Sequence, residues 1–499
     1  MSGNFEKLNI HLKKAAAFTS VLNLIDYDGQ VNAPAESDEN MSKVTGIIAG
    51  EYHDIFTKKE FTHLLDKCVK DAKKGKLTAV ERCIVKEAVR KNRELMPIPA
   101  DEYKEFSELT ARSVNVWAQA RKNKSFDEFA PELEKIVDIK KKFASYIKKS
   151  SKEKYKGRNE YDVLLSSFER DFMSEELDDI FEQVKTAVIP LVKNVKETDC
   201  SFLKLEKEDI PALREFCSYI ADYIGFNNRR GTIGESEHPF TINMHNHDVR
   251  ITNSFNADNI LEPIFSIIHE GGHALYEQGI SDTLTLTVLG EGTSMGMHEG
   301  QSRFYENMIG RNECFWKPLY ARLTDTFSDK LKDVSFEKFM DAVNAVTPGP
   351  IRIAADELTY PLHIIIRYEL EKLLFSGKID VKDLPSEWNK RYEKYLGIKP
   401  ENDAQGVLQD IHWSMGEFGY FPSYLIGSAV SAQIYSHLAD IMPVEKYMKD
   451  GNLSDITSYL RENIYRYGKM YGTNQLLKKM MGEEFNIRYY IDYLTKKWG

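Results

Sequence analysis

The segment His269-Glu270-Gly271-Gly272-His273 combines residue types that can bind a metal ion and move a proton. On a helix, its two histidines lie at positions i and i+4, about one turn apart, so both imidazoles can reach one metal ion. Glu270 lies beside that pair, where its carboxylate can take a proton from metal-bound water. This HExxH pattern predicts a zinc site that carries its own general base.

The residues around the motif predict the helix that it needs. Pro263 suits the first turn of a helix, apolar residues fill the positions before His269, and Gly279 provides an end. Gly271 and Gly272 each cost a helix roughly 1 kcal/mol relative to alanine. We therefore expect something, such as a substrate or a neighbouring strand, to approach the backbone of this helix closely.

A hydrolytic zinc ion also needs a third protein ligand and an open position. The downstream carboxylates Glu277, Glu291 and Glu299 are the candidates. Glu277 lies one turn past His273 on the same helix, too far along its axis. Glu291 lies in a glycine-flanked turn, whereas Glu299 lies in a segment with the apolar spacing of a second buried helix. Because a helix holds a ligand more rigidly than a turn does, we prefer Glu299.

The composition and spacing of most of the remaining chain also predict helices. The 499 residues include 29 glycines and 16 prolines, which is below their usual share. Amphipathic helical spacing runs from residue 1 to about 225, for example over 126–149, and it resumes after about residue 256. Between these parts, alternating residues at 240–244 and 249–252 predict a small antiparallel sheet. The fold class is therefore mainly α.

No repeat, low-complexity segment or Pro/Ser linker separates independent domains. We expect a single domain over 1–499, with an N-terminal helical lobe over about 1–225 and a catalytic lobe over about 226–499. The formal net charge of −10 argues against a nucleic-acid partner. Five widely spaced cysteines, no visible signal peptide and no long apolar stretch predict a cytoplasmic protein that does not enter membranes.

Further motifs accompany the HExxH segment between about Tyr161 and the C-terminus. They are HPF at 238–240, DVRIT at 248–252, HEGQSR at 298–303, IRIAAD at 351–356, GVLQDIHW at 406–413 and GYFPSYLIGSA from residue 419. Together they resemble the thermostable carboxypeptidase 1 (carboxypeptidase Taq) family of metallocarboxypeptidases. This resemblance places the third metal ligand in HEGQSR, where it is Glu299.

The resemblance implies an almost wholly helical, saddle-shaped fold with a deep central groove, like that of neurolysin-type peptidases. A small sheet borders the active site in that fold. The family is usually homodimeric and depends on one zinc ion per chain, with cobalt as an effective substitute.

The resemblance also implies the reaction, which is release of C-terminal amino acids from peptides with a free C-terminus. In this reaction Glu270 is the general base. A side-chain donor should help to stabilise the oxyanion, and His412 and Tyr420 are candidates. Recognition of the terminal carboxylate calls for a cation at a fixed distance from the zinc, and the candidates in the family-like motifs are His238, Arg250 and Arg352.

Each carboxylate-binding candidate has a structural alternative. Arg250 could pair with Asp248, Arg352 could pair with Asp356 or Glu357, and His238 could hydrogen-bond a loop.

Three other functions compete with this prediction. An oligoendopeptidase has the same fold and zinc chemistry, so spacing alone does not exclude it. A gluzincin aminopeptidase typically needs glutamate where this chain has Gly292, and a GxMEN-like motif that is not found. A binding protein with structural zinc would use cysteines near the motif, whereas the nearest is Cys314 and the general base Glu270 is retained.

Overall fold

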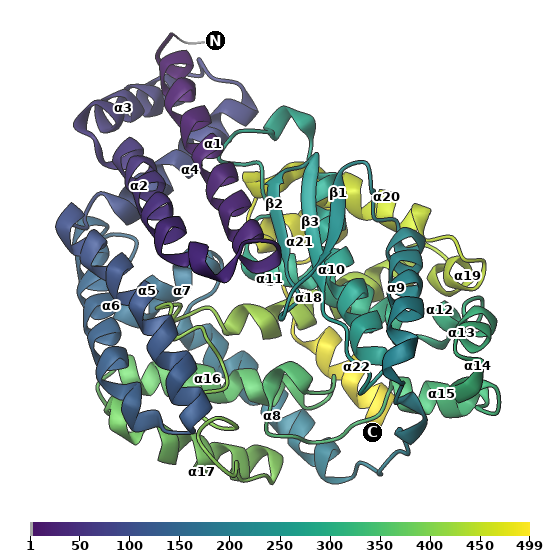
Figure 1. Ribbon diagram of the computed structural model, residues 1–499. Coiled ribbons are helices and arrows are strands. Elements are labelled where there is room, and N and C mark those ends of the chain that lie inside the picture. The colour runs from purple at the N-terminus through teal and green to yellow at the C-terminus, as the bar shows by residue number, and fades with distance from the viewer. Residues whose placement is uncertain (1–2) are drawn as a thin grey trace. The chain divides into compact units, whose positions relative to one another are not determined.

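Helices make up most of the chain in the computed structural model, which describes residues 3–499 (Figure 1). The chain divides into two units, each built from three separate segments. Unit 1 contains Met1–Asn92, Thr198–Asn344 and Gly427–Asn486, and unit 2 contains Arg93–Glu197, Ala345–Ile426 and Ile487–Gly499. The single domain with two lobes stays a prediction.

Unit 2 is helical. Its helices are α5 (Ala100–Asn123), α6 (Ala130–Ser150), α7 (Glu160–Phe168), α8 (Ser174–Lys193), α16 (Tyr360–Phe375), α17 (Leu384–Leu396) and α22 (Arg488–Trp498). The helix predicted over 126–149 is confirmed as α6 with a preceding 3₁₀ turn, and it buries Leu133, Ile136, Val137 and Phe143 at helical spacing.

Unit 1 contains the sheet and the HExxH motif. Its helices are α1 (Gly3–Val31), α2 (Asp38–Thr57), α3 (Lys59–Lys73), most of α4 (Ala79–Leu95), α9 (Ile210–Ile224), α10 (Leu261–Gly279), α11 (Met295–Arg303), α12 (Glu313–Trp316), α13 (Tyr320–Thr326), α14 (Ser328–Leu331), α15 (Phe336–Val343), α18 (Pro422–Ile441) from Gly427 onward, α19 (Val444–Lys449), α20 (Ser454–Asn463) and α21 (Thr473–Met481).

The sheet has three strands, β1 (Gly231–Glu235), β2 (Thr241–His245) and β3 (Asp248–Asn253), in the order β1-β3-β2. The prediction of a small sheet is confirmed, but the sheet is mixed. β2 and β3 are antiparallel because a two-residue turn joins them. β1 pairs with the other edge of β3 and runs parallel to it, which corrects the wholly antiparallel prediction.

Helices cover this sheet and fix its place beside the motif. α10 packs against β2 and β3, and α1 lies along β2 (Figure 1). Two side chains of α1 donate to β2 carbonyls, Ser20 Oγ to Met244 at 2.6 Å and Asn23 Nδ2 to Asn243 at 2.7 Å. These bonds pair groups on a strand edge that would otherwise lack partners.

Within residues 3–499, no helix has the length and apolar content needed to cross a membrane.

Candidate metal centre

The helix α10 carries both histidines of the HExxH motif on one face. It is buried along almost its whole length, as a helix with an apolar N-terminal half and two internal glycines can be. Apart from Glu262, only Ser266, His269 and His273 keep partial exposure, and they lie on one face at i, i+3 and i+7. The predicted helix and the common orientation of both imidazoles are confirmed.

The two glycines between the histidines allow close packing of neighbouring helices. A β-carbon on Gly271 would lie 2.4 Å from Cδ1 of Ile224 in α9, and one on Gly272 would lie 2.7 Å from Cα of Ser302 in α11. The expected close approach to the helix backbone is confirmed, and the approaching elements are the helices α9 and α11, not the strand or substrate given as examples. The approach of α11 brings Glu299 to the histidine face.

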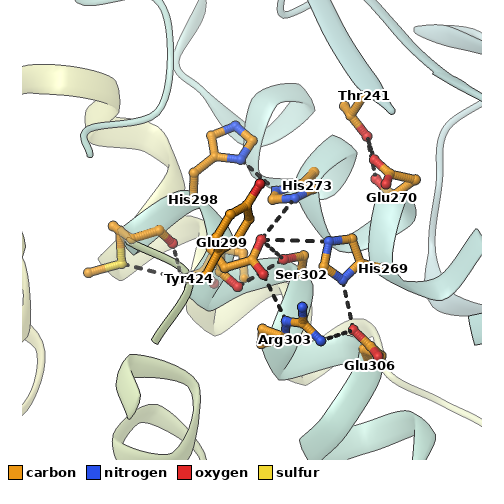
Figure 2. Close-up of polar contacts among 12 residues, drawn as sticks. Thr241, His269, Glu270, His273, His298, Glu299, Ser302, Arg303, Glu306 and Tyr424 are labelled. Carbon is orange, nitrogen blue, oxygen red and sulfur yellow. Dashed lines mark hydrogen bonds and ion pairs between the residues drawn. The ribbon is translucent and has the colours of Figure 1, made fainter. Parts of the chain in front are cut away.

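Glu299 completes a group of three donor residues with His269 and His273 (Figure 2). Oε2 of Glu299 lies 3.6 Å from Nε2 of His269 and 3.4 Å from Nε2 of His273. Gly427 of α18 leaves room for this carboxylate, since a β-carbon there would lie 2.5 Å from Cγ of Glu299. Within residues 3–499, no other group of three or more His, Cys, Asp and Glu residues is arranged to hold a metal ion.

The donor set fits a hydrolytic divalent metal ion. Ligand atoms that lie about 2.1 Å from a tetrahedral centre are about 3.4 Å apart, close to the distances in this group. Two imidazoles and one carboxylate are a set used by catalytic zinc sites, which keep their fourth position open. Glu291, the alternative third ligand, is absent from the group and instead forms an ion pair with Lys469.

Arg303 and Glu306 support the donor group. Nδ1 of His269 lies 2.7 Å from Oε2 of Glu306, while Arg303 donates from Nε to Glu299 at 2.7 Å and from Nη1 to Glu306 at 3.0 Å. Glu306 is carried by a π-helix, Phe304–Gly310, that continues α11 and is a form frequent at functional sites. Although burial opposes ionisation, Arg303 and His269 hold the pKa of Glu299 well below its ordinary value. Glu299 is therefore anionic and suited to bind a cation.

The candidate general base Glu270 lies beside the group and is oriented by the sheet. Oγ1 of Thr241, in β2, donates to Oε2 of Glu270 at 2.6 Å. Burial raises the pKa of Glu270 above its ordinary value. A carboxylate with increased affinity for a proton, held in one orientation, suits general-base chemistry.

Comparison with known proteins identifies the family. The carboxypeptidase Taq (M32) metallopeptidase family matches residues 7–498. The chain belongs to this family. Carboxypeptidase 1 of Bacillus subtilis is 37% identical over 502 residues, which cover 98% of this chain and 96% of that protein. The crystal structure of the M32 carboxypeptidase from Deinococcus radiodurans R1 is similar, with a TM-score of 0.93, 32% identity and 99% of both chains covered. The prediction of a metallocarboxypeptidase that acts on peptides is confirmed.

The fold extends beyond the M32 family. PZ peptidase A has a TM-score of 0.59 to this chain at 11% identity, with 97% of this chain and 90% of that chain covered. A likeness at this identity shows a shared fold alone. It confirms the predicted fold class, a mainly helical oligopeptidase fold with a small sheet.

Two carboxylate-binding candidates belong to the sheet region in unit 1, Arg250 on the central strand β3 and His238 between β1 and β2. Arg250 donates from Nε and Nη2 to the two carboxylate oxygens of Asp248, both at 2.9 Å, which is the structural alternative that the sequence left open. It also lies over the ring of Tyr27, 5.0 Å from the centroid. The His238 side chain is exposed, with Nε2 4.0 Å from Glu237. Neither residue contacts the donor group.

The third candidate, Arg352, lies in unit 2 and is buried. Its guanidinium pairs with Asp410 at 2.8 Å, and not with Asp356 or Glu357, the partners named in the structural alternative. Arg367 of α16 pairs with the same carboxylate at 2.6 Å. Among residues 3–499, no other carboxylate forms an ion pair with either arginine. Two guanidiniums therefore share one anion.

The oxyanion candidates His412 and Tyr420 are neighbours in unit 2, with ring centroids 5.4 Å apart. Nε2 of His412 lies 3.1 Å from the hydroxyl of Tyr424. Burial and the nearby Arg352 lower the pKa of His412 to about 3, so this imidazole is neutral at physiological pH. A neutral imidazole donates one N–H bond and accepts another.

Sequence reasoning missed the residues that surround the ligands, which are Thr241, His298, Arg303 and Glu306. Arg303 lies one helical turn after Glu299, a spacing that could have marked it as an ion-pair partner. Glu306 gave no comparable signal, because its position depends on the π-helix.

Proposed function

We propose that this M32 enzyme is a zinc-dependent carboxypeptidase that releases C-terminal amino acids, with His269, His273 and Glu299 as metal ligands. The observation that carries the proposal is the convergence of these three side chains next to Glu270, in a chain of this family. When bound, zinc supplies Lewis-acid chemistry that polarises the scissile carbonyl and acidifies water.

The residues of the chain supply proton transfer and orientation. Glu270 takes the proton of the attacking water and later delivers it to the leaving amine. Thr241 holds the carboxylate of Glu270 in one direction, so the base does not need to reorient. His412 and Tyr420 are the proposed donors to the developing oxyanion.

Arg352 is the proposed anchor for the substrate's terminal carboxylate. Because Arg352 and Arg367 share the single carboxylate of Asp410, their cluster retains positive charge that a second carboxylate can balance. Arg250 is less suitable because its fork already binds both oxygens of Asp248. His238 is exposed and stays a weaker candidate.

A pair of peptides that differ only in a free or amidated C-terminus tests this proposal. Amidation removes a charge-assisted contact and leaves the excess positive charge of the buried Arg352–Arg367–Asp410 cluster unbalanced, which should cost ~2–5 kcal/mol. That corresponds to a fall in kcat/KM of roughly 30- to 4,000-fold. Equal rates on both peptides would instead support the alternative, an oligoendopeptidase of the same fold.

Two matched variants then identify the anchor. Arg352→Ala should lose the discrimination between the two peptides, and Asp410 keeps Arg367 as a partner, so the fold should persist. Arg250→Ala should retain the discrimination. The reverse pattern would move the anchor to Arg250.

We also propose that the enzyme is a cytoplasmic homodimer in which cobalt can replace zinc. The family resemblance supports the dimer and the metal exchange, and the odd number of cysteines supports a reducing compartment. Sedimentation equilibrium tests the dimer, and activity after reconstitution with cobalt tests the exchange.

A further inference from the structure

The two metal-binding histidines are supported in different ways. Nδ1 of His269 lies directly against the carboxylate of Glu306, at 2.7 Å. Nδ1 of His273 instead lies 2.6 Å from Nδ1 of another imidazole, that of His298 on α11 (Figure 2). A histidine ligand normally has its second nitrogen bound by a carboxylate, a carbonyl or water, so a second histidine in this place requires explanation.

The explanation lies on the far side of His298. Its Nε2 is 2.7 Å from Oε1 of Glu277, a buried residue one turn beyond His273 on α10. Glu277 is held by two further donors, the backbone N–H of Gly292 at 2.9 Å to Oε1 and the amide of Asn243 to Oε2. These three polar contacts make Glu277 the fixed, accepting end of a series of hydrogen bonds that leads to His273.

The number of protons then determines the direction of each bond. Glu277 accepts from the Gly292 N–H and from the Asn243 amide, so it is also the acceptor for Nε2 of His298. With the ring proton of His298 on Nε2, its Nδ1 is an acceptor, and Nδ1 of His273 donates to it. His273 is therefore left with a lone pair on Nε2, the atom that lies 3.4 Å from Oε2 of Glu299. This series of hydrogen bonds selects the tautomer of His273 that can bind a metal ion.

The surroundings of His298 also hold its ring in place. Its ring packs against His273 and Tyr276, with centroid separations of 4.6 Å and 5.3 Å. Gly292 gives the imidazole room, because a β-carbon there would lie 2.6 Å from Cδ2 of His298.

We infer that His298 and Glu277 are positioning residues that act in series, as a relay that fixes the tautomer and ring orientation of His273 for metal binding. The inference rests on the proposed zinc site. Glu277, which the sequence analysis considered as a third metal ligand, has a different role in this inference. It acts through His298 on the ligand His273.

The test measures zinc dissociation constants by competition with a chelator, for the full chain and five variants. His298→Ala removes the relay and should weaken zinc binding roughly 10- to 100-fold. His298→Asn places an amide oxygen near the position of Nδ1, so it should bind zinc more tightly than His298→Ala does. Glu277→Gln removes the charge but keeps an acceptor for Gly292, and the Asn243 amide can rotate so that its unpartnered Oδ1, in place of Nδ2, accepts from the new amide. This variant should weaken zinc binding by a smaller factor.

The double variant distinguishes a relay from two separate effects. If both residues act through one path, His298→Ala combined with Glu277→Gln should bind zinc no more weakly than His298→Ala alone. As a matched control, His437→Ala removes a partly buried histidine that pairs with Tyr459 at 3.0 Å, and it should leave zinc affinity unchanged. The melting temperature of each metal-free variant reports structural damage separately.

Each result decides the inference. Unchanged zinc affinity in folded His298→Ala and Glu277→Gln would overturn the relay, and so would losses that add in the double variant. If His298→Ala does not fold, Glu277→Gln and His298→Asn still provide the comparison. An unmodified chain that binds no zinc would overturn the proposed cofactor together with the inference, whereas tight binding with insensitive variants would overturn the relay alone.

Discussion

The backbone of Gly272 lies so close to Ser302 that a β-carbon would come within 2.7 Å of the Ser302 Cα. Because these contacts are to backbone atoms, α11 cannot yield by moving a side chain. The contact determines the distance between the helix that carries two proposed ligands and the helix that carries the third.

Gly272→Ala should therefore separate α10 from α11. Overpacking of this kind typically costs about 1–3 kcal/mol, and the separation should also lower zinc content at a fixed zinc concentration. Thermal unfolding and elemental analysis measure the two effects. Gly50→Ala in α2 is the control, since a β-carbon there meets nothing within 4 Å and should be neutral or stabilising. Equal behaviour of the two variants would show that the close approach is unimportant.

Zinc content also tests the third ligand. Glu299→Ala should reduce zinc per chain sharply, because it removes one of three donors and leaves Arg303 without its nearest anion. Glu291→Ala should leave zinc content nearly unchanged, because Glu291 pairs with Lys469 instead. Elemental analysis after dialysis against buffer with trace zinc provides the measurement. A loss confined to Glu291→Ala would contradict the assignment.

The general base can be separated from the ligands. Glu270→Gln should retain zinc, because Glu270 is outside the donor group, yet lose roughly 10²- to 10⁴-fold in kcat. The isostere can still accept a hydrogen bond from Thr241, so the local structure should persist. The measurement is steady-state kinetics on the zinc-loaded variant, and near-normal turnover would reject Glu270 as the base.

A buried carboxyl group in unit 2 predicts how stability depends on pH. Glu371 on α16 accepts bonds from Tyr161, Trp413 and the Gly419 backbone. Burial outweighs these donors and raises its pKa to about 7, above the ~4.3 of an unfolded chain. The folded state then holds the proton more tightly, so this contribution to stability is full below about pH 4.3 and is lost as pH rises through about 7.

Glu371→Gln isolates that contribution because it removes the titrating group. Between pH 5.5 and pH 8, the unmodified chain should lose about 2 kcal/mol of stability relative to the variant. Unfolding curves of both proteins across this range provide the comparison. Parallel pH dependence would mean that Glu371 has an ordinary pKa.

The sequence alone determined the parts of the site that depend on local spacing. His269 and His273 face the same direction because they lie four residues apart on a helix, and that helix follows from its apolar residues, Pro263 and Gly279. The helix of Glu299 could be predicted in the same way. The oligopeptidase-like fold and the reaction could be predicted from the family motifs.

The packing of distant segments, which local spacing does not contain, sets which residues meet across long separations in the chain. Arg352 pairs with Asp410, a partner 58 residues away, rather than with the adjacent acids that the sequence offered. The sheet is mixed because β1 pairs with β3 in the parallel direction. The support of His273 by His298 depends on the approach of two helices at Gly272, and local periodicity contains no information about which helices pack together. Hydrophobic spacing specifies that one face of a helix is buried, whereas side-chain packing determines which other helix or strand covers that face.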